Sequence, residues 1–192
     1  MIVLTKDEKR IFKRLTEKRQ IHTMGVLEYG LELCDRWNGN AEKFRLAAVF
    51  HDLYRGISKE DLNPLVRKYG LDEKYLDNPS LAHGKLARIA MEREYGITDV
   101  EVLDAVDCHT TGRAGMTLLD KILFLADAGE KGRSYPGLET LRELAQKDLN
   151  AACAFSIRNT IRFVNEKGGW VDPESIQALE DLETKAKEPI NL

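Results

Sequence analysis

The sequence contains only four histidines, and the residues beside them are of the types that bind metal ions. His51 is followed directly by Asp52 at the end of a mainly apolar run, residues 44–50. An imidazole and a carboxylate at the end of a buried segment are costly to desolvate, and a bound cation compensates both. The alternative interpretation is a capping pair, in which Asp52 bonds to nearby backbone and His51 fills space.

Asp127 and His22 are the other donors of this predicted metal centre. Asp127 follows the apolar run 122–126, so its helix is expected to carry it inward, and His22 lies near the apolar Met24 and Leu27. Together with the His51-Asp52 doublet they supply two imidazoles and two carboxylates from three helices. Such a mixed nitrogen and oxygen set suits iron, manganese or a similar divalent metal with open coordination positions.

The two remaining histidines lie beside features suited to phosphate. His83 precedes Gly84, where backbone can approach a ligand closely. His109 opens a segment that combines two hydroxyls, freed backbone N–H groups and a guanidinium, namely Thr110, Thr111, Gly112 and Arg113. Arg55 and Arg113 are the preferred phosphate contacts, because each follows a predicted ligand closely. Further cations near these motifs are Arg19, Lys121 and Arg133.

Helical signals dominate the chain, and no stretch of useful length alternates as a half-buried strand does. The run 118–127 is apolar at one end, but its length and the cap at Thr117 favour a buried helix. Ser58 and Thr98 are expected to cap helices, and Pro64 is expected to break a short helix rather than lie within a longer one. The predicted helices lie near 6–18, 20–37, 41–54, 58–69, 80–95, 98–107, 117–129, 137–147, 149–167 and 173–187. The sequence therefore predicts one all-α domain.

Composition excludes several other classes of protein. Of 192 residues, 43% are hydrophobic and 32% are charged, and the net charge of −3 gives no overall attraction to nucleic acid. No stretch approaches the roughly 20 apolar residues of a membrane helix. Cys34, Cys108 and Cys153 are scattered, which is typical of reduced core cysteines. We therefore expect a cytoplasmic protein with no nucleic-acid or membrane partner.

The order of these residues along the chain resembles the sequence signature of a known superfamily. His22, the His51-Asp52 doublet and Asp127 resemble the H…HD…D signature of the HD superfamily of phosphohydrolases. The blocks that narrow the resemblance occur in order at 19–26, 51–55, 83–84, 109–113, 125–127 and 132–137. They are similar to the YqeK-type family of symmetrical bis(5'-nucleosyl)-tetraphosphatases, over roughly residues 10–180.

This resemblance implies a compact single-domain helical HD fold over residues 1–192, with its core at about 10–180. It implies symmetrical hydrolysis of diadenosine tetraphosphate to two ADP, with iron as the cofactor. His22, His51, Asp52 and Asp127 match the family's core metal ligands, and His83 and His109 match the histidines that complete a second metal position. Whether one or two ions bind, and whether manganese or another divalent metal replaces iron, stays open.

Two departures from the family pattern concern the substrate. Arg55 stands where the family usually has lysine, and the two side chains are not equivalent at a phosphate contact. The segment 128–133 reads AGEKGR, where the family more often has proline before the glycine. Nucleotide specificity is therefore less firmly implied than metal binding.

The mechanism that this pattern favours is metal-assisted hydrolysis, in which the metal lowers the pKa of a coordinated water for in-line attack on phosphorus. Asp52, Arg55 and Arg113 are the predicted catalytic residues. The predicted substrate contacts are Arg19, Arg55, His83, His109, Thr110, Thr111, Gly112, Arg113, Lys121 and Arg133. Two alternatives stay open, an HD phosphohydrolase acting on another nucleotide and a nucleotide-sensing module without turnover. A homodimer is also left open.

Overall fold

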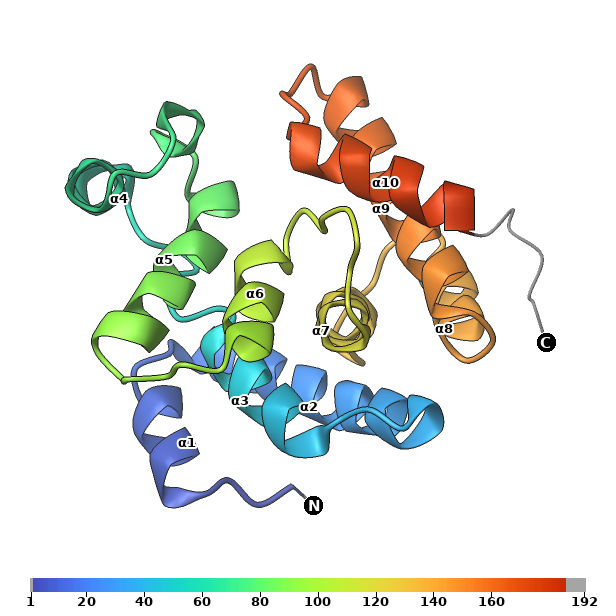
Figure 1. Ribbon diagram of the computed structural model, residues 1–192, viewed down its shortest axis with the longest axis horizontal. Coiled ribbons are helices and arrows are strands. Elements are labelled where there is room, and N and C mark those ends of the chain that lie inside the picture. Colours follow the sequence, from blue (N-terminus) through green and yellow to red (C-terminus); the bar gives the residue numbers. More distant parts are fainter. Residues whose placement is uncertain (1, 186–192) are drawn as a thin grey trace.

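The computed structural model describes residues 2–185, and these form helices joined by loops (Figure 1). The α-helices are α1 (Lys6–Phe12), α2 (Glu17–Trp37), α3 (Ala41–Phe50), α4 (Lys59–Tyr69), α5 (Pro79–Arg93), α6 (Val100–Cys108), α7 (Leu118–Gly129), α8 (Leu138–Ala145), α9 (Leu149–Glu166) and α10 (Pro173–Lys185). A single 3₁₀ turn, η1 (Glu73–Tyr75), joins α4 to α5. No strand occurs between residues 2 and 185. The predicted all-α class is confirmed.

Helix α7 runs through the middle of the molecule and is seen end-on in Figure 1. It packs against α2, α6 and α9. Ile122, Leu123 and Leu125 of this helix are at most 1% exposed. Burial of one such side chain stabilises the fold by about 1.5–3 kcal/mol. The apolar run before Asp127 therefore builds the core that holds this carboxylate in place.

The predicted helix starts are partly confirmed. Thr117 caps α7 in a capping box, in which its hydroxyl accepts from the backbone N–H of Asp120 and the Asp120 carboxylate accepts from the N–H of Thr117. Ser58 caps α4 as expected. The prediction for Thr98 is wrong, because Asp99 caps α6 and accepts from two backbone N–H groups. A carboxylate is the stronger acceptor for the free N–H groups of a helix start.

The prediction that Pro64 breaks a helix is also wrong. Pro64 lies inside α4, which continues to Tyr69. Proline costs a helix one backbone hydrogen bond. Leu62 and Val66, one helical turn apart, are at most 1% exposed and pack in a second cluster with Tyr75. Their burial outweighs the lost hydrogen bond.

Some predicted helix ends are displaced. The helix predicted at 6–18 ends at Phe12, because Thr16 caps α2 and that helix begins at Glu17. The helix predicted at 41–54 ends at Phe50, and His51 is its C-cap. The predicted end at 187 lies outside the described residues.

The α9–α10 hairpin is tied to α5 and α6 by a partly buried network of charges. Lys85 on α5 donates to Asp107 at 2.6 Å and to Glu174 at 3.2 Å. Lys74 donates to Asp172 at 3.2 Å. These pairs fix the C-terminal hairpin against the helices that carry two of the histidines.

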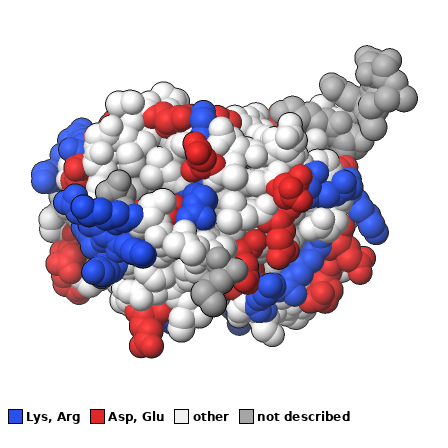
Figure 2. All heavy atoms as spheres, turned by 90° about the horizontal axis from the view of Figure 1, so that it is seen from below, with Lys and Arg blue, Asp and Glu red and all other residues white. Residues whose placement is uncertain are grey.

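The surface carries both signs of charge. Figure 2 shows acidic and basic side chains on one face, with basic ones gathered near its left edge. None of the helices between residues 2 and 185 has the length and apolar character to span a bilayer. The three cysteines are buried and free, as expected. The predicted location, the absence of nucleic-acid and membrane partners, the homodimer and the single-domain span 1–192 stay predictions.

Candidate metal centre

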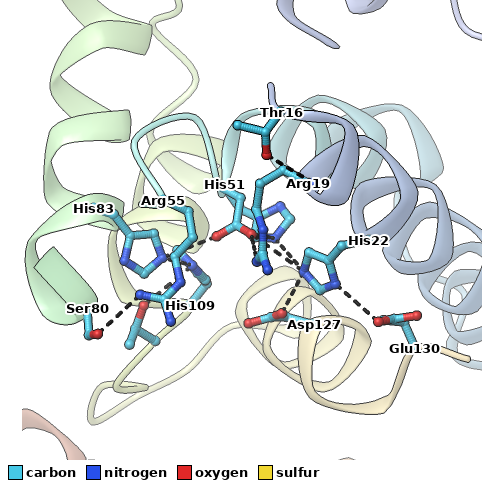
Figure 3. A network of polar contacts seen from close by, with 12 residues as sticks. Thr16, Arg19, His22, His51, Arg55, Ser80, His83, His109, Asp127 and Glu130 are labelled. Atoms are coloured by element: carbon cyan, nitrogen blue, oxygen red, sulfur yellow. Dashed lines mark hydrogen bonds and ion pairs between the residues drawn. The ribbon is translucent and has the colours of Figure 1, made fainter. Parts of the chain in front are cut away.

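The six predicted metal ligands converge on one place from five helices (Figure 3). His22 comes from α2, His83 from α5 and Asp127 from α7, and His51-Asp52 and His109 directly follow the ends of α3 and α6. All four histidines and Asp52 are buried, and the Asp127 side chain is 23% exposed. Helices far apart in the sequence therefore bring one donor set together.

The first group of donors surrounds His22. Its Nε2 lies 3.0 Å from Asp127 Oδ1 and 3.3 Å from His51 Nε2. Asp52 Oδ2 lies 3.6 Å from the Nε2 atoms of both His22 and His51. His22, His51 and Asp52 each place a donor atom within 4.8 Å of the other two. This spacing suits one metal ion.

The second group uses the other side of the same carboxylate. Asp52 Oδ1 lies 3.4 Å from His83 Nε2, which lies 2.9 Å from His109 Nε2. These three residues satisfy the same 4.8 Å limit. Asp52 therefore belongs to both groups, with one carboxylate oxygen facing each.

Each imidazole is oriented through its other ring nitrogen. In all four histidines Nδ1 faces a carbonyl or carboxylate oxygen that accepts a hydrogen bond, and this contact directs Nε2 toward the other donors of the site. The contacts are His51 to Ala48 O at 2.7 Å, His109 to Val106 O at 2.6 Å, His83 to Pro79 O at 3.3 Å and His22 to Glu130 Oε1 at 3.2 Å. The capping interpretation, in which Asp52 bonds to nearby backbone and His51 fills space, explains none of these imidazole contacts.

The donor set fits a divalent metal. Nε2 lone pairs that face one another and a carboxylate repel unless a cation lies among them. Burial lowers the pKa of His109 to about 3 and also lowers the pKa of His51. Burial acts to raise the pKa of Asp52, but the adjacent imidazoles outweigh it and hold this pKa well below its usual range. Neutral imidazole and ionised carboxylate are the forms that bind metal.

His22 differs from the other imidazoles in its pKa. Burial acts to lower this pKa, but the hydrogen bond and charge of Asp127, together with the hydrogen bond to Glu130, outweigh it, so the pKa of His22 is raised. A carboxylate that attracts a proton to Nε2 attracts a metal cation in the same way. His22 and Asp127 are therefore suited to binding the same cation.

Three of the predicted phosphate contacts lie beside this donor set. Arg19 donates to Asp52 Oδ2 at 2.8 Å. Arg133 binds the Asp127 carboxylate and donates from Nε to its backbone oxygen at 2.9 Å. Arg55 donates to Ser80 Oγ at 3.2 Å and lies next to His83 and His109 (Figure 3). The site therefore has cations on several sides.

Arg113 and Lys121 are placed differently. The Arg113 guanidinium binds Asp120 at 2.8 Å and Asp104 at 3.0 Å. Among the described residues, no hydrogen bond or ion pair joins Arg113 to the imidazoles. Lys121 lies six residues before Asp127 on α7, which places it about 120° away around the helix. The catalytic role of Arg113 and the substrate role of Lys121 stay predictions.

The rest of the predicted phosphate segment is held by packing. Thr110 Oγ1 lies 3.4 Å from His109 Nε2, and the Thr111 hydroxyl is 2.9 Å from the Gly112 carbonyl and 3.3 Å from Glu174. Gly112 has φ of +71°, and an added Cβ would meet Ile157 and Ala178 at 3.1 and 3.2 Å. Only Thr110 of this segment thus adjoins a ligand, and the substrate roles of Thr111 and Gly112 stay predictions.

Glu130 is the one residue of this site that the sequence interpretation missed. Its side chain is 6% exposed, one oxygen faces His22 Nδ1 and the other accepts from the backbone N–H of Gly132. A Cβ at Gly25 would overlap this carboxylate, so a larger residue there would displace the Glu130 side chain from its present position. The sequence feature that could have identified Glu130 is its position three residues, or about one helical turn, after Asp127.

Comparison with known proteins places the chain in a family. Residues 19–132 match the family model of the HD domain. The matched segment includes all six predicted ligands and Glu130. The chain therefore belongs to the HD-domain family, and the predicted class, a metal-dependent phosphohydrolase, is confirmed.

Within that family the chain is similar to symmetrical bis(5'-nucleosyl)-tetraphosphatases. It is 39% identical to the Bacillus subtilis protein of that name, over 85% of this chain and 88% of that protein. It is 37% identical to the Halalkalibacterium halodurans protein, over 88% and 90%. These relatives confirm the resemblance noted from the sequence.

A solved structure confirms the HD fold. It is described as a predicted HD superfamily hydrolase involved in NAD metabolism from Clostridium acetobutylicum, and it superposes with a TM-score of 0.87 at 35% identity. The match covers 96% of this chain and all of that one. The fold and the donor set together define a divalent metal site.

Proposed function

We propose that this protein hydrolyses diadenosine tetraphosphate symmetrically to two ADP at an iron centre. His22, His51, Asp52 and Asp127 would hold one ion, and His83 and His109 would complete a second position with Asp52. The observation that carries the proposal is the shared carboxylate of Asp52, which faces two donor groups in a chain whose relatives bear the name of this activity.

A metal held by these ligands would supply an activated water and would neutralise charge on the phosphate oxygens. The symmetrical reaction breaks the P–O bond that bridges the second and third phosphates. The water oxygen bonds to one of these phosphorus atoms, and the other half of the substrate leaves as ADP. Both products are identical, so cleavage must occur at the midpoint of the chain.

The chain's own cations are suited to holding the polyphosphate. Arg19 and Arg133 each contact a metal ligand, and Arg55 follows Asp52 by three residues. Guanidinium groups beside the reacting phosphate stabilise the charge that grows on its oxygens. This role does not distinguish adenine from guanine. The base must be recognised elsewhere.

The test is product analysis with anaerobically purified protein whose metal content has been measured. We expect ADP to be the only nucleotide product from diadenosine tetraphosphate. AMP together with ATP would contradict symmetrical cleavage. Nucleoside or inorganic phosphate from other nucleotides, with diadenosine tetraphosphate untouched, would favour a different HD phosphohydrolase. Tight binding without any product would favour a nucleotide-sensing module.

A further inference from the structure

Two cavities border the metal centre, and Arg133 forms part of the wall of both. The first, here called the α9 cleft, has a volume of about 710 Å³ and is lined by Arg55, Tyr135, Phe155 and Phe163 among others. The second, the α2 cleft, has a volume of about 510 Å³ and is lined by Arg19, Ile21, His22 and Met24 among others. Both volumes are typical of small-molecule sites.

The α9 cleft has the chemistry of a nucleobase site. Phe163 is 59% exposed and Tyr135 is 40% exposed, so aromatic faces are open to a ligand. Exposed aromatic side chains stack on bases regardless of base identity. Asn159 also lines the cleft, and a side-chain amide can pair with the donor and acceptor on one edge of adenine.

The α2 cleft combines an apolar face with cations. Ile21 is 68% exposed on α2, and Met24 and Gly25 follow it at helical spacing along the same wall. Because Gly25 has no side chain, it leaves space for a ligand on this side of the cavity. Lys18 and Lys131 border the same cavity. Glu28 and Glu130 also line it, and Lys131 is paired with Glu28 at 3.1 Å, which leaves Lys18, Arg19 and Arg133 as the cations nearest the phosphate path. An exposed isoleucine beside these cations suits a flat apolar group attached to phosphate.

The α2 cleft adjoins a predicted ligand directly, and the α9 cleft approaches the metal centre through Arg55 and Arg133. His22 lines the α2 cleft, and Arg55 lines the α9 cleft three residues after Asp52. Helix α7, which carries Asp127, contacts both α2 and α9 and lies between them in Figure 1. Arg133 binds Asp127 and also borders both cavities. The metal centre thus lies at the junction of two ligand-sized spaces.

We propose that each cleft binds one nucleoside of a two-ended polyphosphate, with Arg133 against its central phosphates. The inference rests on the proposed function and adds the reason for symmetrical cleavage. A substrate with a nucleoside anchored on each side has the midpoint of its phosphate chain at the metal centre. Two base sites, rather than the metal ligands, then determine which bond breaks.

The test compares a substrate that has two nucleosides with one that has a single nucleoside. Phe163→Ala removes the more exposed of the two exposed aromatic side chains of the α9 cleft, and Ile21→Ser removes the exposed apolar side chain of the α2 cleft. We expect each variant to raise the KM for diadenosine tetraphosphate, about tenfold for Phe163→Ala, the typical loss for one stacked base. For adenosine 5'-tetraphosphate we expect a rise of no more than about threefold, because its one nucleoside can use the remaining cleft.

The controls separate recognition from damage to the fold. The double variant should raise the KM for both substrates, and Phe163→Tyr, which keeps an aromatic ring, should have a lower KM for diadenosine tetraphosphate than Phe163→Ala. Trp170→Ala removes an aromatic side chain that is 53% exposed and lines neither cleft, so it should change neither KM. A single variant that leaves both KM values unchanged, or raises them equally, would overturn the two-cleft proposal.

Failure of the proposed function gives a different result. If the wild type releases no ADP, ADP binding to the metal-loaded protein is measured by calorimetry. Two ADP per chain in the wild type and one in Phe163→Ala would support the clefts as nucleoside sites. Identical ADP binding by the two proteins would overturn them.

Discussion

Arg113 and Arg133 both lie a few residues after a predicted metal ligand, yet the fold gives their guanidinium groups different partners. Arg133 binds Asp127 and borders the two clefts beside the metal centre. Arg113 is held between Asp104 and Asp120, and the Asp120 side chain is fully buried. The same residue type near the same kind of motif thus contacts a predicted metal ligand in one case and two carboxylates outside the donor set in the other.

The difference comes from the path that the chain takes after each ligand. After Asp127 the chain leaves α7 at Glu130 and turns back, so that Arg133 returns to the carboxylate six residues earlier. After His109 the chain passes Gly112 in the left-handed region and leads toward α7, where Asp120 lies at its start. Distance along the sequence to a ligand therefore does not determine the role of an arginine.

Loss of Asp52, the carboxylate shared by the two donor groups, should have the largest effect. The activity that remains in this variant is the lower limit against which the Arg133 and Arg113 variants are compared. Asp52→Ala removes the one carboxylate that, within residues 2–185, belongs to both donor groups. We expect loss of bound metal and of activity, with helicity by circular dichroism largely retained. Elemental analysis of the purified variant checks the result. Full activity in this variant would rule out Asp52 as a ligand.

Arg133→Ala should have the next largest effect. It removes a cation that lies against Asp127 and the phosphate path, so we expect kcat/KM to fall about 100-fold with the metal still bound. Arg158→Ala is the matched control, because Arg158 is an exposed arginine paired with Glu183 on the C-terminal hairpin. Steady-state kinetics with both variants decide the matter. Equal kcat/KM values for the two would remove Arg133 from the site.

Glu130→Gln should have a smaller effect that appears in metal binding. An amide orients His22 less strongly than a carboxylate, so we expect metal affinity to fall about tenfold. Glu139→Gln, at a side chain that is 81% exposed, is the control and should leave affinity unchanged. Competition with a chelator measures both affinities. Wild-type affinity in Glu130→Gln would show that this carboxylate does not support the ligand.

Arg113→Ala should have the smallest effect on catalysis. We expect kcat/KM to change by no more than about threefold. Stability should fall by about 1–2 kcal/mol, because buried Asp120 loses its cation while Arg113 itself is partly exposed. Urea unfolding and kinetics are measured on the same preparation. A tenfold or larger loss of kcat/KM at unchanged stability would restore the catalytic role predicted from the sequence.

The histidines and acids of the site could be predicted from the sequence, because the free-energy cost of burying an ionisable side chain can be judged from the residues next to it in the chain. An ionisable side chain such as Asp127 at the end of an apolar run needs compensation wherever the run is buried. The partners of Arg113 depend on how α6 and α7 pack against each other, and the spacing of residues along the sequence does not show this. Glu130 was missed for the same reason, since its role depends on the close approach of Gly25 from α2. Pro64 was misjudged because the burial of its neighbours, not its own preference, decides the helix.

The most direct test of the metal centre is anomalous diffraction from crystals of anaerobically purified protein, measured at the iron absorption edge. We expect one peak among the Nε2 atoms of His22 and His51 and the carboxylates of Asp52 and Asp127. With both positions filled, a second peak should lie among Asp52, His83 and His109. Anomalous peaks only at sites remote from these side chains, in crystals of active protein, would contradict the account.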